Sequence, residues 1–325
     1  MTPVTLDFDI GGGSILGGMT KTMTAVAVTQ FGSADVLRLI TLPLPEPGPG
    51  EVRLRVHAAG VQPFDVAVRQ GMGPPAGAAV LPQVIGNEYA GVVDAVGPGV
   101  DSPRVGDEVL GFALYGSYAQ YRIAPAENLV AKPESMPWAV AGSFSAGAQT
   151  AAMAVEELGV RAGETLLVHA GAGAVGTMAI QLARLRGATV IATASPANHD
   201  YLRELGAIPV EYGDGLVARV RALAPRGVDA AIDAAGIDAL TASIELGVDR
   251  DRIITLVVWD RYTEFGVRRV TGTRSAVRLA GLVDLYDRGL LRAHVRSRYP
   301  LAAASHAHRE VETGHGRGRV VLVIP

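Results

Sequence analysis

The chain has 325 residues, of which 49% are hydrophobic and 19% are charged, and its formal net charge at pH 7 is −3. The length exceeds what one hydrophobic core usually supports, and the apolar content excludes a disordered chain. The chain contains no cysteine, which excludes disulfides, thiolate metal sites and a cysteine nucleophile, while the charge provides no basic field for nucleic acid or anionic lipid.

The first twenty residues have the composition of a tail. Residues 1–20 are rich in glycine, and Asp7 and Asp9 stand where a signal peptide would have an apolar run. We therefore expect residues 1–20 to form a flexible extension outside the fold. Because no targeting signal and no run of about 18 apolar residues occurs, we expect a cytoplasmic protein without a membrane partner.

The segment up to residue 146 predicts a β-rich domain. Pro- and Gly-rich turns separate short alternating runs, a pattern typical of antiparallel strands. We expect these strands to form a partly barrel-like sheet. The predicted strands are Ala25–Val28, Val36–Ile40, Val52–Ala58, Tyr89–Val96 and Ser117–Ile123.

The pattern changes in residues 147–272, where continuous apolar runs alternate with helical periods. Continuous runs are typical of parallel strands covered on both faces, and the alternation predicts a doubly wound sheet. The expected strands are Thr165–Ala170, Thr189–Thr193, Val228–Ile232 and Ile253–Val258, and the expected helices are Val175–Arg186, Asp200–Leu205 and Leu216–Ala224.

The last part of the chain predicts a helix at Ser275–Arg288 and a closing strand at Arg319–Ile324. We expect this segment to return to the first domain. The predicted fold is therefore α/β, with residues 21–146 and 273–325 in a β-rich domain. We expect residues 147–272 to form a domain with a doubly wound parallel sheet, the architecture of a Rossmann domain.

A glycine-rich turn follows the first strand of the predicted Rossmann domain. Gly171 permits the tight turn, Gly173 allows backbone N–H groups to approach a pyrophosphate, and Gly176 allows the helix to pack on the strand. The N-terminus of that helix, at Ala174 and Val175, provides free N–H donors. A strand before and a helix after the turn are the context that a dinucleotide site requires.

The end of the second strand favours NADPH over NADH. An NAD site needs an acidic residue there to accept from the ribose 2′-hydroxyl, but the sequence has Thr193-Ala194-Ser195-Pro196, and Asp200 comes too late. Small uncharged residues leave room for a 2′-phosphate. We expect donors to it from Ser195, His199, Tyr212 and Arg319, and further cofactor contacts from Ala235 and Val257.

Several stretches, in this order and spacing, resemble the medium-chain dehydrogenase/reductase superfamily, and within it the zinc-independent quinone oxidoreductase (zeta-crystallin-like) branch. The resemblance runs from about residue 23 to 325. It implies a GroES-like catalytic domain built from both ends of the chain, a Rossmann domain between them, an active site in the cleft, and a homodimer joined through Ile253–Val258. The stretches are Gly60–Asp65, Ile85–Val93, Val105–Val109, the glycine-rich turn and Gly318–Leu322.

The resemblance also bears on metal. Zinc-dependent members place Cys and His ligands at positions matched here by Gln62 and Asn87, and neither residue type is a usual zinc ligand. We therefore expect no metal. Without a Lewis acid, alcohol oxidation is disfavoured, whereas reduction of a quinone or an activated C=C needs only orientation and a hydrogen-bond donor for the developing oxyanion.

The candidate donors are Gln62, Asn87, Tyr115 and Tyr118, although each tyrosine also suits packing in a β domain. The predicted function is NADPH-dependent hydride transfer to a small-molecule quinone or α,β-unsaturated carbonyl. The alternatives are an enoyl-thioester or natural-product tailoring reductase, and a non-catalytic NADPH-binding protein. The arginines between 268 and 278 suit either an anionic substrate tail such as CoA or a solvated helix face.

Overall fold

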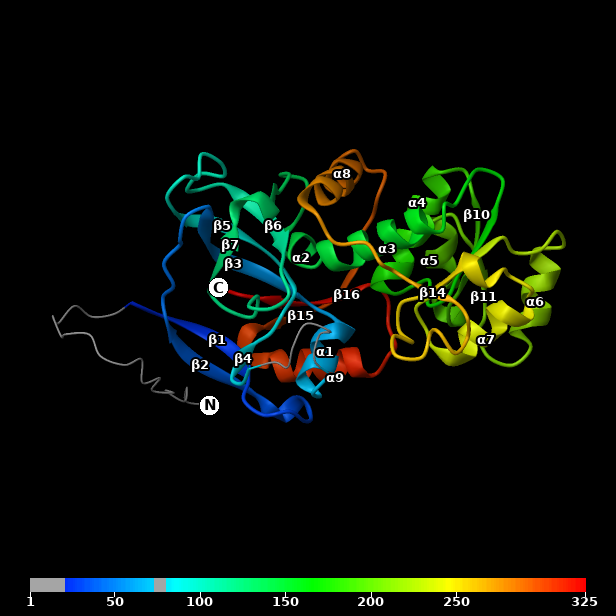
Figure 1. Ribbon diagram of the computed structural model, residues 1–325, viewed down its shortest axis with the longest axis horizontal. Coiled ribbons are helices and arrows are strands. Elements are labelled where there is room, and N and C mark those ends of the chain that lie inside the picture. The colour runs from blue at the N-terminus through cyan, green and yellow to red at the C-terminus, as the bar shows by residue number, and fades with distance from the viewer. Residues whose placement is uncertain (1–20, 73–79) are drawn as a thin grey trace. The chain divides into compact units, whose positions relative to one another are not determined.

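The computed structural model describes residues 21–72 and 80–325, so the predicted N-terminal extension lies outside the described residues (Figure 1). The chain divides into two compact units. The first unit holds the described residues up to Ala146 together with Val295–His315 and Arg319–Pro325, and the second holds Gly147–His294 and Gly316–Gly318.

The first unit contains a seven-stranded sheet and a three-stranded sheet, and antiparallel pairs predominate in both. The large sheet has the order β15-β16-β3-β5-β6-β8, with β7 also paired to β3, and the small sheet has the order β2-β1-β4. The strands are β1 (Thr22–Val28), β2 (Leu37–Pro43), β3 (Glu51–Val61), β4 (Gln83–Val84), β5 (Glu88–Val96), β6 (Glu108–Phe112), β7 (Tyr121–Pro125), β8 (Leu129–Ala131), β15 (Val295–Pro300) and β16 (Arg319–Val323).

Two of the predicted strands of the first unit start later than expected. The second strand starts at Leu37 because a 3-10 turn, Ala34–Val36, precedes it, and the expected strand Ser117–Ile123 becomes β7 at Tyr121–Pro125. Residues 117–120 instead run irregularly, since the Ser117 and Tyr118 amides donate to the Ile85 carbonyl. Polar contacts outside the ladder therefore overrode the alternating pattern.

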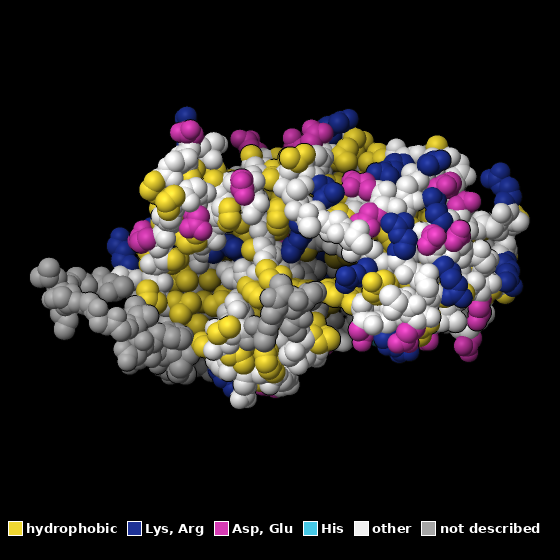
Figure 2. All heavy atoms as spheres, in the orientation of Figure 1, with side chains coloured by type: hydrophobic (Ala, Val, Ile, Leu, Met, Phe, Trp, Pro, Cys, Tyr) yellow, Lys and Arg dark blue, Asp and Glu magenta, His cyan; other side chains and the backbone are white. Residues whose placement is uncertain are grey.

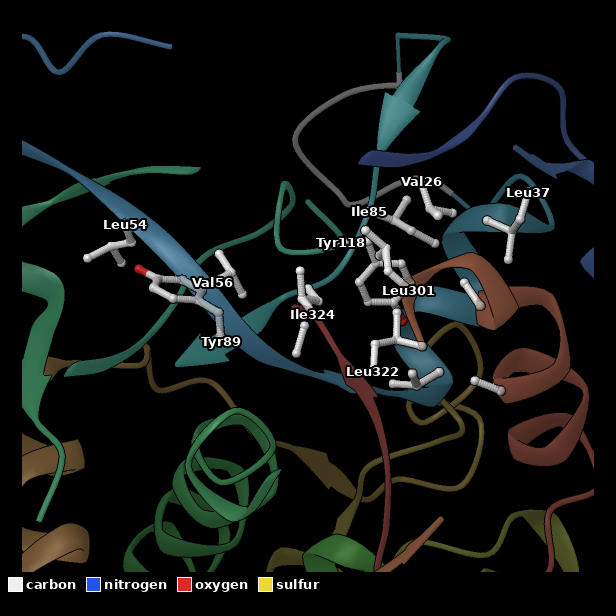
Figure 3. Packing of buried hydrophobic residues seen from close by; sticks show 14 of the residues in the cluster. Val26, Leu37, Leu54, Val56, Ile85, Tyr89, Tyr118, Leu301, Leu322 and Ile324 are labelled. Carbon is white, nitrogen blue, oxygen red and sulfur yellow. The ribbon is translucent and has the colours of Figure 1, made fainter. Parts of the chain in front are cut away.

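The helices of the first unit are α1 (Pro63–Arg69), α2 (Trp138–Ala141) and α9 (Ala304–Glu312). The main core of the first unit lies between its sheets and two of its helices, α1 and α9, as Figure 3 shows for Val26 on β1, Val56 on β3, Tyr89 on β5 and Leu322 on β16. The C-terminal strand β16 pairs antiparallel with β3, Val321 opposite Gly60, so the end of the chain completes this unit.

The second unit is the doubly wound domain that the sequence predicts. Its six strands are parallel, in the order β11-β10-β9-β12-β13-β14, and residues such as Leu166 and Ile232 are fully buried because both faces are covered. The strands are β9 (Thr165–Val168), β10 (Thr189–Thr193), β11 (Ile208–Val210), β12 (Ala230–Asp233), β13 (Ile253–Thr255) and β14 (Arg268–Arg269). The helices are α3 (Ser145–Glu157), α4 (Ala174–Leu185), α5 (His199–Glu204), α6 (Leu216–Leu223), α7 (Ile237–Glu245) and α8 (Ala276–Asp287).

The second unit differs from the expectation at two places. Residues 273–294 group with it rather than with the β-rich domain, because the Ser275 amide donates to Gln149 Oε1 (2.8 Å) and the Arg292 amide to Gln181 Oε1 (2.8 Å). Ile253–Val258, the expected edge of the sheet, is not its outermost strand, since the two-residue strand β14 pairs with β13.

Candidate functional site

The glycine-rich turn lies where β9 and β10 end and α4 begins. Gly173 is the N-cap of α4, and its amide donates to the Ala170 carbonyl (3.0 Å). The Gly171 amide donates to the Thr193 carbonyl (2.8 Å), and Thr193 Oγ1 accepts from the Ala170 amide (3.1 Å). The turn is therefore fixed to both strands, and the N-terminal amides of α4, at Ala174 and Val175, follow it directly.

Glycine stands at the three positions of the turn for different physical reasons. A Cβ on Gly171 would lie 2.8 Å from the Ala192 methyl, and one on Gly176 would lie 2.4 Å from the Ala170 carbonyl oxygen. A Cβ on Gly173 would meet only that oxygen, at 3.2 Å. Packing thus requires Gly171 and Gly176, whereas the space beside Gly173 is open, which fits the close approach of a pyrophosphate.

The loop after β10 carries polar groups that turn toward one another. Ser195 Oγ accepts from Asn198 Nδ2 (3.2 Å), and His199, the first residue of α5, contacts the Ala194 carbonyl through Nε2 (3.3 Å). Asp200 forms an ion pair with Arg203 one turn later and is exposed. The Asp200 carboxylate therefore points to Arg203, and Thr193, Ala194, Ser195 and Pro196 at the end of β10 carry no charge, as the sequence indicates.

The arginine beside this loop is Arg317 and not Arg319. Arg317 Nε donates to Asn198 Oδ1 (3.2 Å), and its guanidinium lies over the Tyr201 ring. Arg319 is 2% exposed and lies in β16 of the first unit, so its prediction as a phosphate donor does not hold. The two differ because Gly316–Gly318 groups with the second unit, whereas Arg319 starts a strand of the first. Tyr212, after β11, is exposed.

Two further loops follow β12 and β13 and carry Ala235 and Val257. Asp233 joins them, a residue that was not predicted from the sequence. It is fully buried at the end of β12 and accepts from Thr255 Oγ1 (2.8 Å). Burial raises the pKa of Asp233, and hydrogen bonds from the Gly236 and Ala235 amides oppose that rise. A single acidic residue ending an apolar strand is the sequence feature that could have identified it.

In the first unit, Gln62 is the N-cap of α1 and its amide group is held by Glu88. Gln62 Nε2 donates to Glu88 Oε1, and Glu88 Oε2 accepts from the Ala146 amide (2.7 Å). Glu88 is fully buried, and a Cβ on Gly60 would collide with its carboxylate. Glu88, another residue that the sequence analysis missed, follows Asn87 directly, so both predicted amides adjoin it in the chain or in space.

The two tyrosines do not present free hydroxyls. Tyr118 is fully buried, and its hydroxyl lies 3.3 Å from Asp65 Oδ2 and 3.2 Å from His308 Nε2, so the prediction that it donates to a substrate does not fit this placement. Burial raises the pKa of Tyr118 well above its usual value. Tyr115 packs against the same core with its hydroxyl covered. Gln62 and Asn87 remain the candidate donors of this unit.

Within residues 21–72 and 80–325, no group of three or more His, Asp or Glu side chains is placed to hold a metal ion. The helices of these same residues include none of the length and apolarity that a bilayer crossing requires.

Two of the four arginines between 268 and 278 form ion pairs on the second unit. Arg268 lies beside Glu157 (3.8 Å), Arg278 beside Glu156 (3.3 Å), and Arg269 over the Tyr262 ring. On the face shown in Figure 2, basic and acidic side chains are interspersed. These pairs favour the solvated-face interpretation over a site for an anionic substrate tail.

Known proteins share this combination of units. The alcohol dehydrogenase GroES-like domain family matches residues 48–134, and the zinc-binding dehydrogenase family matches residues 205–322. A probable quinone oxidoreductase of Schizosaccharomyces pombe is 35% identical over 224 residues, which cover 68% of this chain and 67% of that protein.

Two solved structures match over nearly all of both chains. The quinone oxidoreductase from Coxiella burnetii has a TM-score of 0.83 and 30% identity, covering 94% of this chain and 100% of that chain. Mycobacterial Rv1454c complexed with NADPH has a TM-score of 0.81 and 33% identity, covering 93% and 100%. The chain therefore belongs to the medium-chain dehydrogenase/reductase family, as an NAD(P)-dependent oxidoreductase of the quinone oxidoreductase type.

Proposed function

We propose that the chain is an NADPH-dependent reductase that transfers hydride, without zinc, to a quinone or an α,β-unsaturated carbonyl. The main support for a preference for NADPH is the position of Arg317. Its side chain contacts Asn198 and Tyr201 beside the loop that follows β10. A guanidinium attracts a phosphate dianion, and Asp200, the first acidic residue after β10, is paired with Arg203. The Rv1454c complex shows that a relative binds NADPH.

The glycine-rich turn and the loop after β10 would hold the two phosphate groups of the cofactor. The open space at Gly173 admits the pyrophosphate, which the N-terminal amides of α4 would receive. Ser195 and Arg317 would receive the 2′-phosphate. The reduced nicotinamide supplies the hydride, and the chain contributes orientation and electrostatics.

Gln62 is suited to stabilise the charge that develops on a substrate oxygen. Glu88 accepts one hydrogen of the Gln62 amide nitrogen, which fixes the orientation of the amide and leaves its second hydrogen to donate. Hydride added to an electrophilic carbon moves electrons to the conjugated oxygen, and a proton from solvent completes the two-electron reduction. A preorganised donor at that oxygen stabilises the transition state.

The zinc-free part of the proposal rests on residue types. Gln62 and Asn87 carry amides, which are poor zinc ligands, and the chain has no cysteine.

The sequence-based expectations of a homodimer and a cytoplasmic location stay predictions, to be checked by light scattering and cell fractionation.

The deciding experiment is the consumption of NADPH and of NADH by the purified chain, each with a panel of quinones, enones and enoyl thioesters. We expect kcat/KM to favour NADPH by about tenfold or more, which corresponds to one charge-assisted contact. We also expect turnover to survive chelation of zinc. A preference for NADH would overturn the cofactor assignment. NADPH binding without turnover of any acceptor would indicate a non-catalytic binding protein.

A further inference from the structure

The carboxyl ends of β12 and β13 are joined by one buried side chain. Asp233, the last residue of β12, is fully buried, and its Oδ2 accepts from the hydroxyl of Thr255, the last residue of β13 (2.8 Å). A buried carboxyl is unfavourable unless donors satisfy it. Two apolar side chains would fill this space without that cost. Packing alone therefore does not explain why Asp233 and Thr255 stand here.

The same carboxyl also determines the backbone of both following loops. Asp233 Oδ1 accepts from the amides of Ala235 (2.8 Å) and Gly236 (2.9 Å), which fixes the turn into α7. Thr255 Oγ1, while donating to Asp233, accepts from the amides of Val257 (3.3 Å) and Val258 (3.1 Å). One residue thus holds residues 234–236 directly and residues 256–258 through Thr255.

These loops lie at the second half of a dinucleotide site. The strand order reverses between β9 and β12, which are neighbours in the sheet. In a doubly wound domain the dinucleotide spans the carboxyl edge at this reversal, with one mononucleotide on each half. The glycine-rich turn and Ser195 belong to the half that receives the adenosine, so the loops after β12 and β13 belong to the half that receives the nicotinamide.

We propose that Asp233 is a positioning residue for the nicotinamide half of the cofactor, acting through Thr255 and the amides of the two loops. The proposal rests on the proposed function only in requiring that the chain binds a nicotinamide dinucleotide. It predicts that changes at Asp233 affect one half of the cofactor and leave the adenosine half unaffected.

Asp233→Asn is the sharpest variant because it keeps the size of the side chain. The new amide must direct its NH2 either at the Ala235 and Gly236 amides or at Thr255. Thr255 cannot accept it, since two backbone amides already donate to its oxygen. Either orientation places donor against donor, so at least one loop loses its restraint.

The experiment is isothermal titration of the full chain with NADPH and with adenosine 2′,5′-bisphosphate, a probe that lacks the nicotinamide half. For Asp233→Asn we expect the Kd of NADPH to rise about tenfold or more and the Kd of the bisphosphate to stay unchanged. Thr255→Val should shift the same ratio less, because Asp233 still holds Ala235 and Gly236. Asp238→Asn, a change of an exposed carboxylate on α7, is the matched control and should change neither.

An equal loss of affinity for both ligands, or no loss for NADPH, would overturn the positioning role. If Asp233→Asn does not fold, Thr255→Val decides by the same ratio. A wild-type chain that binds neither ligand would overturn the proposed function as well. A wild-type chain that binds both without turnover would overturn only the enzymatic activity, and the ratio would still test Asp233.

Discussion

The guanidinium carbon of Arg317 lies 4.5 Å from the centre of the Tyr201 ring, while its Nε donates to Asn198. Tyr201 is itself fixed, because its hydroxyl lies 3.1 Å from Thr177 Oγ1 on α4. A cation stacked in this way loses little side-chain entropy when it binds an anion. In the proposed NADPH complex, the ring would preorganise Arg317 for the 2′-phosphate next to Ser195.

Replacing Arg317 by alanine should change cofactor preference. We expect the Kd of NADPH to rise by about 10- to 100-fold, the value of one charge-assisted contact, and the Kd of NADH to stay unchanged. Fluorescence titration with both cofactors measures this. Arg288→Ala, which removes an exposed arginine at the end of α8, is the control and should affect neither. Equal losses for both cofactors would contradict the role of Arg317.

Replacing Gly173 by valine should abolish cofactor binding while the fold persists. The one heavy atom near a Cβ at this position is the Ala170 carbonyl oxygen, 3.2 Å away, so a small shift of that carbonyl admits a side chain, which would occupy the space that a pyrophosphate needs. The control is Gly281→Val in α8, where nothing lies within 4 Å of a Cβ. Titration and thermal unfolding report on the two effects, and retained NADPH affinity would refute this placement.

Replacing Gln62 by alanine should lower kcat more than NADPH affinity. Loss of one oxyanion donor costs about 10²- to 10³-fold in the best-studied hydrolases, and we expect at least a tenfold loss here. Gln70→Ala, a glutamine at the other end of α1, is the matched control. Steady-state kinetics and titration separate the two quantities, and an unchanged kcat would remove Gln62 from the mechanism.

Buried histidines should make the protein sensitive to acid. Burial lowers the pKa of His169 to about 4, from an ordinary value of 6.5. The unfolded chain therefore binds more protons than the folded chain between these values, and the free energy of unfolding falls as the pH is lowered from 6.5 to 4. For a pKa shift of this size, the full decrease in the free energy of unfolding is roughly 3 kcal/mol.

Urea unfolding at several pH values measures this dependence. His169→Gln should flatten it, since glutamine does not titrate, whereas His315→Gln, at an exposed position, should leave it unchanged. His308, whose pKa burial lowers to about 3, contributes in the same direction and should keep part of the slope in the His169 variant. Identical slopes for the wild type and His169→Gln would refute the assignment.

The parts of the site that depend on local spacing were predictable from the sequence. The turn at Gly171, Gly173 and Gly176 needs only a strand before it and a helix after it, and both elements have strong periodicity. The uncharged end of β10 was visible for the same reason. The correction from Arg319 to Arg317 shows the limit of such prediction. The two residues are near neighbours in the chain but belong to different units, and no periodicity marks the boundary between the units.

The polar groups inside the fold were not predictable in the same way. Tyr118 looked like a donor because its strand pattern puts no constraint on its hydroxyl, yet Asp65 and His308 come to it from distant segments. Asp233 and Thr255 end two apolar strands, and only the sheet order makes them neighbours. Such partnerships depend on tertiary contacts, which single-sequence patterns do not contain.

The pairing of Val321 with Gly60 has a consequence for biosynthesis. During translation the β3 edge that receives β16 stays without its partner until the ribosome has made the whole second unit. The second unit has nearly all of its residues at His294, before β16 begins at Arg319, and contacts of such long sequence separation as that between β3 and β16 form slowly. We therefore expect the sheet of the β-rich unit to be completed last.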